Sequence, residues 1–155
     1  MAEERNTENR VLLVEVQACV CVLSLSCVIE TFRPVPIEPI SGAPSYLRGI
    51  SIIRGTPTPV VDLGDLLGNH GGVSGRFVTL RVGDRQVALS VGKVLGVRAM
   101  DALAVQKLPP LLQGASKGTI EAVGTLDSQF LVVLHNGWRL PDEMWRSPEA
   151  REKDQ

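Results

Sequence analysis

The sequence predicts an all-β fold, either a barrel or a sandwich, from three observations. Segments with strand character recur at a spacing of roughly eight to twelve residues, separated by turn residues. No stretch shows the long 3.6-residue periodicity of an amphipathic helix. The composition is 44% hydrophobic but only 4% aromatic, so the core must consist mainly of aliphatic side chains, and the β-branched ones favour sheets. A chain of 155 residues can form one domain or two closely packed subdomains.

The first half of the chain contains four predicted strands, at residues 11–16, 19–25, 50–53 and 58–62. The first two would form a hairpin through Gln17 and Ala18. Three prolines, Pro34, Pro36 and Pro39, then exclude a helix or a central strand and indicate an edge or a connector. Arg54-Gly55 is predicted to be the turn between the third and fourth strands.

Three short helical turns are predicted in the same half. Ser24 or Ser26 can cap a turn over residues 28–30, and Pro44 can open a turn through Tyr46 and Leu47. Asp62 is expected to cap a turn at residues 63–67, which Gly68 ends.

The second half begins with a loop at residues 69–75 and then shows a clear hairpin. Apolar residues alternate with polar or small ones over 78–82 and 87–91, around the turn Gly83-Asp84. Residues 94–97 are expected to continue that sheet, and 100–118 to be a long connection. A last hairpin is predicted from 120–126 and 130–134, turning at Asp127-Ser128, and a terminal helix is predicted at 138–145.

Charge and apolar patterning argue against two classes of partner. Sixteen basic and seventeen acidic residues give a net charge of -1, without the basic patch typical of nucleic-acid or lipid binding. The apolar run at 11–29 resembles a signal peptide or membrane span. However, it contains Glu15, which would cost about 2.5–3.5 kcal/mol near the centre of a span. The residues before it include Glu3, Glu4 and Glu8 rather than a basic region. Two adjacent buried strands explain the run better.

The sequence offers little catalytic or metal-binding chemistry. Cys19 and Cys21 share one face of a strand and could bind metal with His70 or His135, but a single Cys-x-Cys pair is a weak signal. Buried cysteines more often serve in packing, and three cysteines including Cys27 do not form a disulfide framework, which indicates a reducing cytoplasm. Phosphate-loop and nucleophile-elbow motifs are absent. We therefore expect no catalytic, cofactor-binding or metal site.

One segment resembles a known family. The sequence YLRGISIIRG at residues 46–55, followed by PVVDL at 59–63 and LLG at 66–68, resembles the CheW-like domain family of chemotaxis coupling proteins, and the resemblance extends over roughly residues 11–140. It implies two small SH3-like five-stranded barrels packed together, with short helical turns. The expected organisation is a flexible tail at 1–10, a CheW-like domain at 11–142 and a charged tail at 143–155.

The resemblance also implies a function. Members join methyl-accepting chemoreceptors to a CheA-type histidine kinase, without catalysis in this domain. We expect a cytoplasmic, non-enzymatic adaptor, recruited to receptor arrays, whose partners are that kinase and the cytoplasmic receptor tip, with no nucleic acid and no direct membrane insertion. The alternatives are a scaffold in a divergent motility or second-messenger system, a small cysteine-dependent enzyme and a β-barrel ligand carrier. Ile52 replaces the family's usual Asn, Gly64-Asp65 a commonly basic pair, and His135 a common Asp.

The resemblance places the protein-binding site at six residues, namely Val28, Glu30, Tyr46, Leu47, Arg54 and Gly55. Arg54 matches the arginine of the family's Arg-Gly turn, and Val28 and Glu30 match positions near its receptor and kinase contacts. An ion pair between Glu30 and Arg54 could shape a groove, or it could be a surface pair worth about 0–1 kcal/mol without a functional role. The apolar members could supply a binding surface or pack in the core.

Overall fold

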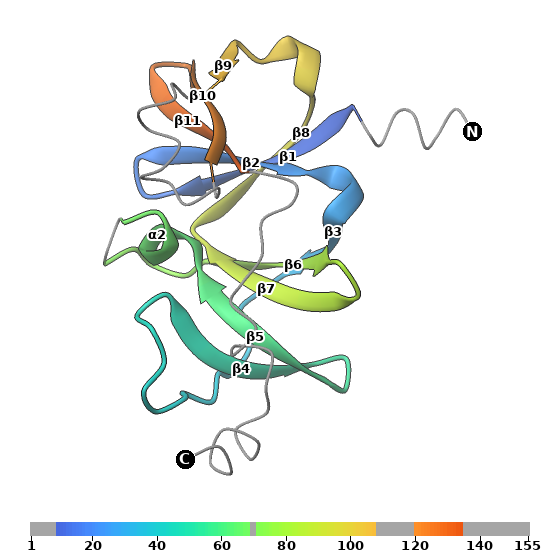
Figure 1. Cartoon of the computed structure of the whole chain (residues 1–155), viewed down its shortest axis with the longest axis vertical. Helices are drawn as coiled ribbons and strands as arrows, with labels where there is room; N and C mark the ends of the chain where they lie inside the picture. Colours follow the sequence, from blue (N-terminus) through green and yellow to red (C-terminus); the bar gives the residue numbers. More distant parts are fainter. Residues whose placement is uncertain (1–8, 69–70, 108–119, 135–155) are drawn as a thin grey trace, which may run out of the picture.

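The structure of the protein is a computed structural model that describes residues 9–68, 71–107 and 120–134. Within these ranges the chain forms two β-sheets and only short helical turns, which confirms the predicted all-β class (Figure 1). The first sheet has six strands in the order β8-β1-β2-β11-β10-β9, and the second has five in the order β3-β6-β7-β5-β4. No helix in this part of the chain has the length and apolar character needed to cross a membrane.

The first sheet combines the N-terminal hairpin with C-terminal strands (Figure 1). Its members are β1 (Arg10–Val16), β2 (Cys19–Ser24), β8 (Lys93–Ala99), β9 (Val105–Lys107), β10 (Ile120–Leu126) and β11 (Gln129–Leu134). β2 pairs in parallel with β11, and β1 pairs antiparallel with β8. The hairpin of β1 and β2 therefore lies between segments that are distant in sequence, so this sheet is complete only when both ends of the domain have come together.

The second sheet is built from one continuous part of the chain. Its members are β3 (Val28–Phe32), β4 (Leu47–Ile53), β5 (Thr56–Asp62), β6 (Arg76–Val82) and β7 (Arg85–Val91). The predicted hairpin around Gly83-Asp84 is confirmed as β6 and β7. A short 3-10 turn, η1 (Leu25–Cys27), connects β2 of the first sheet to β3 of the second.

The helical turn predicted after β5 is present as α2 (Leu63–Leu66). The carboxylate of Asp62 accepts a hydrogen bond from the backbone N–H of Asp65 at 3.0 Å. This bond satisfies one of the donors left free at a helix start. The second carboxylate oxygen of Asp62 binds Arg48 at 3.0 Å. Asp62 therefore has a structural role at the end of β5, as its spacing predicted.

Buried apolar side chains form three clusters. The largest, here called the shared core, lies between the sheets and receives side chains from β1, β2, β5, β6, β7 and β11. Two smaller clusters belong to the first and second sheet respectively. In β1, Leu12 and Val14 face the shared core while Val11 and Leu13 face the smaller cluster. Alternate residues of this strand are thus buried on both faces, which explains why the run that begins at residue 11 is almost uniformly apolar.

Two predictions about local structure are wrong. Residues 28–30 are not helical, because the chain makes the turn η1 first and then enters β3, and neither Ser24 nor Ser26 caps a helix there. Pro44 begins a tight turn closed by the N–H of Leu47, but Leu47 is already the first residue of β4. The Arg54-Gly55 turn is confirmed between β4 and β5.

Two further corrections concern the second half of the chain. β8 does not continue the sheet of β6 and β7, because it pairs with β1 in the first sheet. The expected long connection after β8 contains a 3-10 turn, η2 (Met100–Ala102), and the strand β9, which pairs with β10. The last predicted hairpin is confirmed as β10 and β11. The predicted terminal helix, the charged tail and most of the N-terminal tail lie outside the described residues.

Candidate functional site

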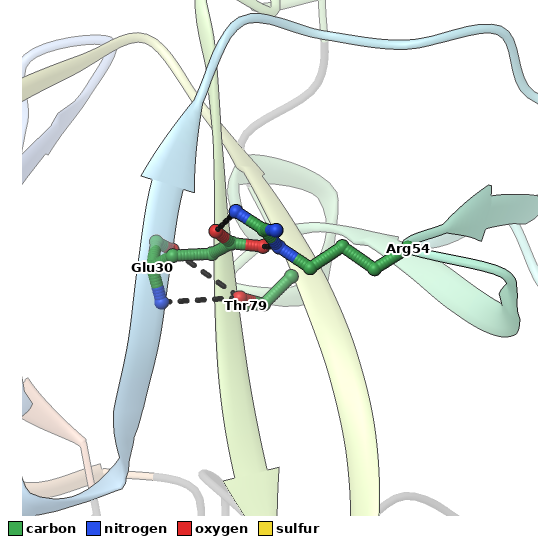
Figure 2. A network of polar contacts seen from close by, with 3 residues as sticks. All are labelled: Glu30, Arg54 and Thr79. Atoms are coloured by element: carbon green, nitrogen blue, oxygen red, sulfur yellow. Dashed lines mark hydrogen bonds and ion pairs between the residues drawn. The ribbon is translucent and has the colours of Figure 1, made fainter.

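The candidate site centres on a bidentate ion pair between Glu30 and Arg54. Arg54 Nε donates to Glu30 Oε1 at 2.8 Å, and Arg54 Nη2 donates to Glu30 Oε2 at 2.7 Å (Figure 2). Two parallel charge-assisted hydrogen bonds fix both distance and orientation, which a single contact does not. The ion pair considered from the sequence is therefore present, and its geometry is well defined.

The turn between β4 and β5 places Arg54 at this position. Arg54 and Gly55 both have positive φ, 51° and 80°, as the two central residues of a two-residue hairpin turn of the primed type require. Glycine tolerates this conformation without strain, which explains its place beside the arginine. β3 and β4 are the two edges of the second sheet, so a contact from this turn to β3 requires the sheet to curl. The ion pair bridges the gap between those edges (Figure 2).

Exposure differs strongly between the two partners. The side chain of Arg54 is 79% exposed, whereas that of Glu30 is 25% exposed. Hydrogen bonds from the Arg54 guanidinium, together with its positive charge, hold the pKa of the Glu30 carboxyl below its usual value, although partial desolvation acts in the opposite direction. The same contacts raise the pKa of Arg54. Both groups are therefore charged at neutral pH, and the arginine presents a fixed guanidinium to solvent.

Only some of the six predicted residues lie near this pair. Gly55 is exposed beside Arg54. Val28, two positions before Glu30, is half-buried against the shared core. Leu47 begins β4 at its other end, and Tyr46 directly precedes it. Seven to eight residues separate them from Arg54, which corresponds to about 25 Å in a strand.

Of the two roles left open for Leu47, binding surface or core packing, its position corresponds to core packing. It is 5% exposed and belongs to the shared core. Tyr46 is half-buried and packs against the same cluster. The stretch that carries the family resemblance therefore has one end directed into the core and the other at the ion pair.

Two exposed aliphatic side chains lie within two positions of the ion pair in the sequence. Neither was among the six predicted residues. Ile29 is 43% exposed and Ile52 is 65% exposed. Ile52 could have been found from alternation, since its neighbours Ser51 and Ile53 are buried and face inward. Ile29 could not, because it is the extra residue of a β-bulge in β3.

Cys19 and Cys21 are enclosed in the protein interior. Cys19 and Cys21 are buried in the shared core, at 7% and 0% exposure, and Cys27 is half-buried. The hydrogen bond with Cys19, followed by burial, raises the pKa of Cys21, while the same hydrogen bond lowers the pKa of Cys19 in spite of its burial. A thiolate at Cys19 would still be enclosed by aliphatic side chains, so a substrate in solution has no access to it.

The metal ligands considered from the sequence are not brought together by the part of the chain that the structure describes. Within residues 9–68, 71–107 and 120–134 there is no group of three or more His, Cys, Asp or Glu side chains that could hold a metal ion. His70 and His135 lie outside these ranges.

Comparison with known proteins identifies the family. The family model of the CheW-like domain matches residues 10–137. Among solved structures, the scaffolding protein TtCheW from Thermoanaerobacter tengcongensis is similar with a TM-score of 0.71 and 20% identity, over 86% of this chain and 97% of that chain. This similarity confirms the expected fold of two SH3-like barrels, to which the two sheets correspond. A comparison with curated proteins gave no match. Since the family model spans most of the 155 residues, the chain belongs to the CheW-like domain family.

Proposed function

We propose that the protein is a non-enzymatic adaptor that couples methyl-accepting chemotaxis receptors to a CheA-type histidine kinase. The observation that carries this proposal is the match of the CheW-like domain to residues 10–137, because joining receptors to the kinase is the role of that family. The adaptor would act in the cytoplasm at receptor arrays, where the receptor tips and the kinase meet. It would need no cofactor, since its work is binding.

The Glu30–Arg54 pair is the contact that we propose for a partner protein. A flexible arginine on a surface loses conformational entropy when a partner immobilises it. Arg54 is already held by two hydrogen bonds, yet it remains 79% exposed. A partner can therefore contact its free face at a smaller entropic cost. The exposed Gly55 adjoins Arg54, and Ile29, next to Glu30 in β3, is 43% exposed and adds an apolar side chain beside the pair in sequence.

The placement of the cysteines supports a binding role over a catalytic one. A cysteine-dependent enzyme needs an accessible thiolate beside a base. Cys19 and Cys21 are enclosed in the shared core between the sheets. Their packing there explains their presence without chemistry.

Ile52 favours a second candidate, a scaffold of the same family in a divergent motility or second-messenger system. It is the residue that replaces the family's usual Asn, and it is 65% exposed on edge strand β4. An exposed isoleucine two residues before Arg54 changes a polar surface to an apolar one. A partner with a matching apolar contact would then be preferred over the usual one.

The proposal is tested by reversing the charge at position 54. We would measure binding of the wild type and of Arg54→Glu to a receptor cytoplasmic fragment and to a CheA-type kinase from the same genome. We expect binding of at least one partner to fall about tenfold or more, which corresponds to about 1.4 kcal/mol, while circular dichroism stays unchanged. Arg48→Glu is the matched control, because Arg48 also forms an ion pair from β4, with Asp62, but about 20 Å further along the strand.

A charge swap distinguishes a requirement for the ion pair itself from a requirement for a positive charge at position 54. In the double variant Glu30→Arg with Arg54→Glu, the ion pair can re-form with reversed polarity. We expect the fold to be kept and partner binding to stay weak, because the exposed charge is now negative. Unchanged binding by Arg54→Glu, with unchanged circular dichroism, would contradict the site assignment. Failure of the wild type to bind either partner would contradict the coupling function.

A further inference from the structure

The strand that carries Glu30 contains a β-bulge that changes the direction of its side chains. Val28 pairs with Leu80 and Glu30 pairs with Thr79, so Ile29 is an extra residue in β3 with no partner in β6. In a regular strand, residues two apart lie on the same face. The bulge removes this relation and places Val28 and Glu30 on different faces of the sheet.

The consequence for Glu30 can be read from its neighbours. Val28, like its partner Leu80, packs in the shared core. Phe32, two residues after Glu30, packs edge-to-face on Phe77 at 5.9 Å, in the small cluster of the second sheet. In a regular strand Glu30 would follow Val28 toward the shared core, where an ionised carboxylate is strongly disfavoured. The bulge instead directs Glu30 to the side that the Arg54 guanidinium reaches.

A buried hydroxyl contacts the backbone of this bulge. Thr79 Oγ1 accepts a hydrogen bond from the backbone N–H of Glu30 at 3.2 Å and donates one to the backbone oxygen of Glu30 at 3.3 Å (Figure 2). Thr79 is fully buried, and its strand β6 is fixed between β3 and β7. The Thr79 side chain thus binds both backbone polar groups of Glu30, directly next to the extra residue of the bulge.

We propose that Thr79 is a positioning residue for the Glu30–Arg54 pair, in which its hydroxyl fixes the bulge of β3 and thereby aims the Glu30 carboxylate at Arg54. In this arrangement the side-chain hydrogen bonds described for Thr79 and for Arg54 both go to Glu30, so Thr79 acts on the pair through Glu30. Its effect on partner binding rests on the proposed function, whereas its effect on the ion pair does not.

The direct test is an NMR titration of the Glu30 side-chain carboxyl in three variants. Thr79→Val removes the hydroxyl and nearly keeps the shape, so we expect the pKa of Glu30 to rise toward its usual value as the bidentate contact is lost. Thr79→Ser restores the hydroxyl, and we expect the lowered pKa to return. Thr58→Val is the matched control, since Thr58 is equally buried in the same sheet but donates only to the backbone oxygen of Thr56, and it should leave Glu30 unchanged.

The possible results separate this inference from the proposed function. A Glu30 pKa that stays low in Thr79→Val, or that rises equally in Thr58→Val, would overturn the inference. If Thr79→Val does not fold, Thr79→Ser is compared with Thr79→Ala, since these two variants also differ by the hydroxyl oxygen. The inference then requires the pKa of Glu30 to be higher in Thr79→Ala than in Thr79→Ser. If the pKa rises in Thr79→Val and partner binding weakens with it, both the positioning role and the binding site are supported. If the pKa rises and binding is unchanged, the positioning role stands and the proposed binding site is refuted.

Discussion

Gly49 lies in β4, where the proline-rich connector packs against that strand at Glu38. Its replacement by alanine should be severely destabilising. A Cβ atom at this position would overlap the backbone oxygen of Glu38 and would lie 2.7 Å from its carbonyl carbon. The φ of Gly49 is +145°, in a region that side chains rarely adopt. Two independent costs therefore arise from one methyl group.

The magnitude follows from what must give way. Glu38 and Ile50 exchange two backbone hydrogen bonds, of 2.8 and 2.9 Å, which hold the connector against β4. Moving Glu38 away from a new Cβ breaks both bonds, at about 0.5–1.5 kcal/mol each. The unfavourable φ adds about 1–3 kcal/mol. We expect Gly49→Ala to lower the free energy of unfolding by about 2–6 kcal/mol, a large part of the stability of a typical domain.

Urea denaturation followed by circular dichroism measures this change. Gly83→Ala is the control, because Gly83 also has a positive φ, +67°, but a Cβ there meets nothing within 4 Å. It should cost only the backbone term of about 1–2 kcal/mol. A loss for Gly49→Ala no larger than that for Gly83→Ala would refute the reasoning, since it would mean that the connector is not held against β4 as described.

Three further predictions concern the core, the thiols and the ion pair. Leu89→Ala in the shared core should cost about 2–5 kcal/mol, and a loss below about 1 kcal/mol in urea denaturation would contradict the packing. A thiol reagent should label the half-buried Cys27 in the native protein and reach Cys21 only after unfolding; equally fast native labelling of both would argue against the buried position. Because the ion pair with Arg54 lowers the pKa of Glu30 in the folded protein, the ionised form should add stability above the usual pKa of a glutamate, and this stability should be lost as the pH falls through the lowered pKa. The difference in urea midpoint between the wild type and Glu30→Gln should therefore vanish in acid, and a difference that persists at the lowest pH would contradict an ion pair with Arg54.

Much of the fold was predictable because its signals are local. The hairpin of β6 and β7 follows from two-residue alternation around Gly83-Asp84, and the cap of α2 follows from the position of Asp62. The Arg-Gly turn could also be placed, since a two-residue hairpin turn needs positive φ at both positions. The Glu30–Arg54 pair came from the family resemblance, and the structure adds its two hydrogen bonds and its unequal exposure.

Features that depend on non-local pairing were not predictable from the same signals. β8 follows directly after β7, yet it pairs with β1, a strand from the beginning of the described chain. β9 has only three residues and no alternation of its own, so its pairing with β10 defines it. A leucine at position 47 could serve in a binding surface or in the core, and only its contact with the shared core decides between the two.

The sequence by itself determined the all-β class, most strands and turns, the family and the residue that should form the ion pair. These depend on side-chain periodicity, turn chemistry and motif, which act over a few neighbouring positions. Only the tertiary structure decided which strands share a sheet, that Leu47 is buried, and that a bulge at Ile29 contacted by the hydroxyl of Thr79 directs Glu30 toward Arg54. The physical reason is that a bulge and its hydrogen-bond partner lie on different strands, 49 positions apart in the sequence, and exist only once those strands have paired.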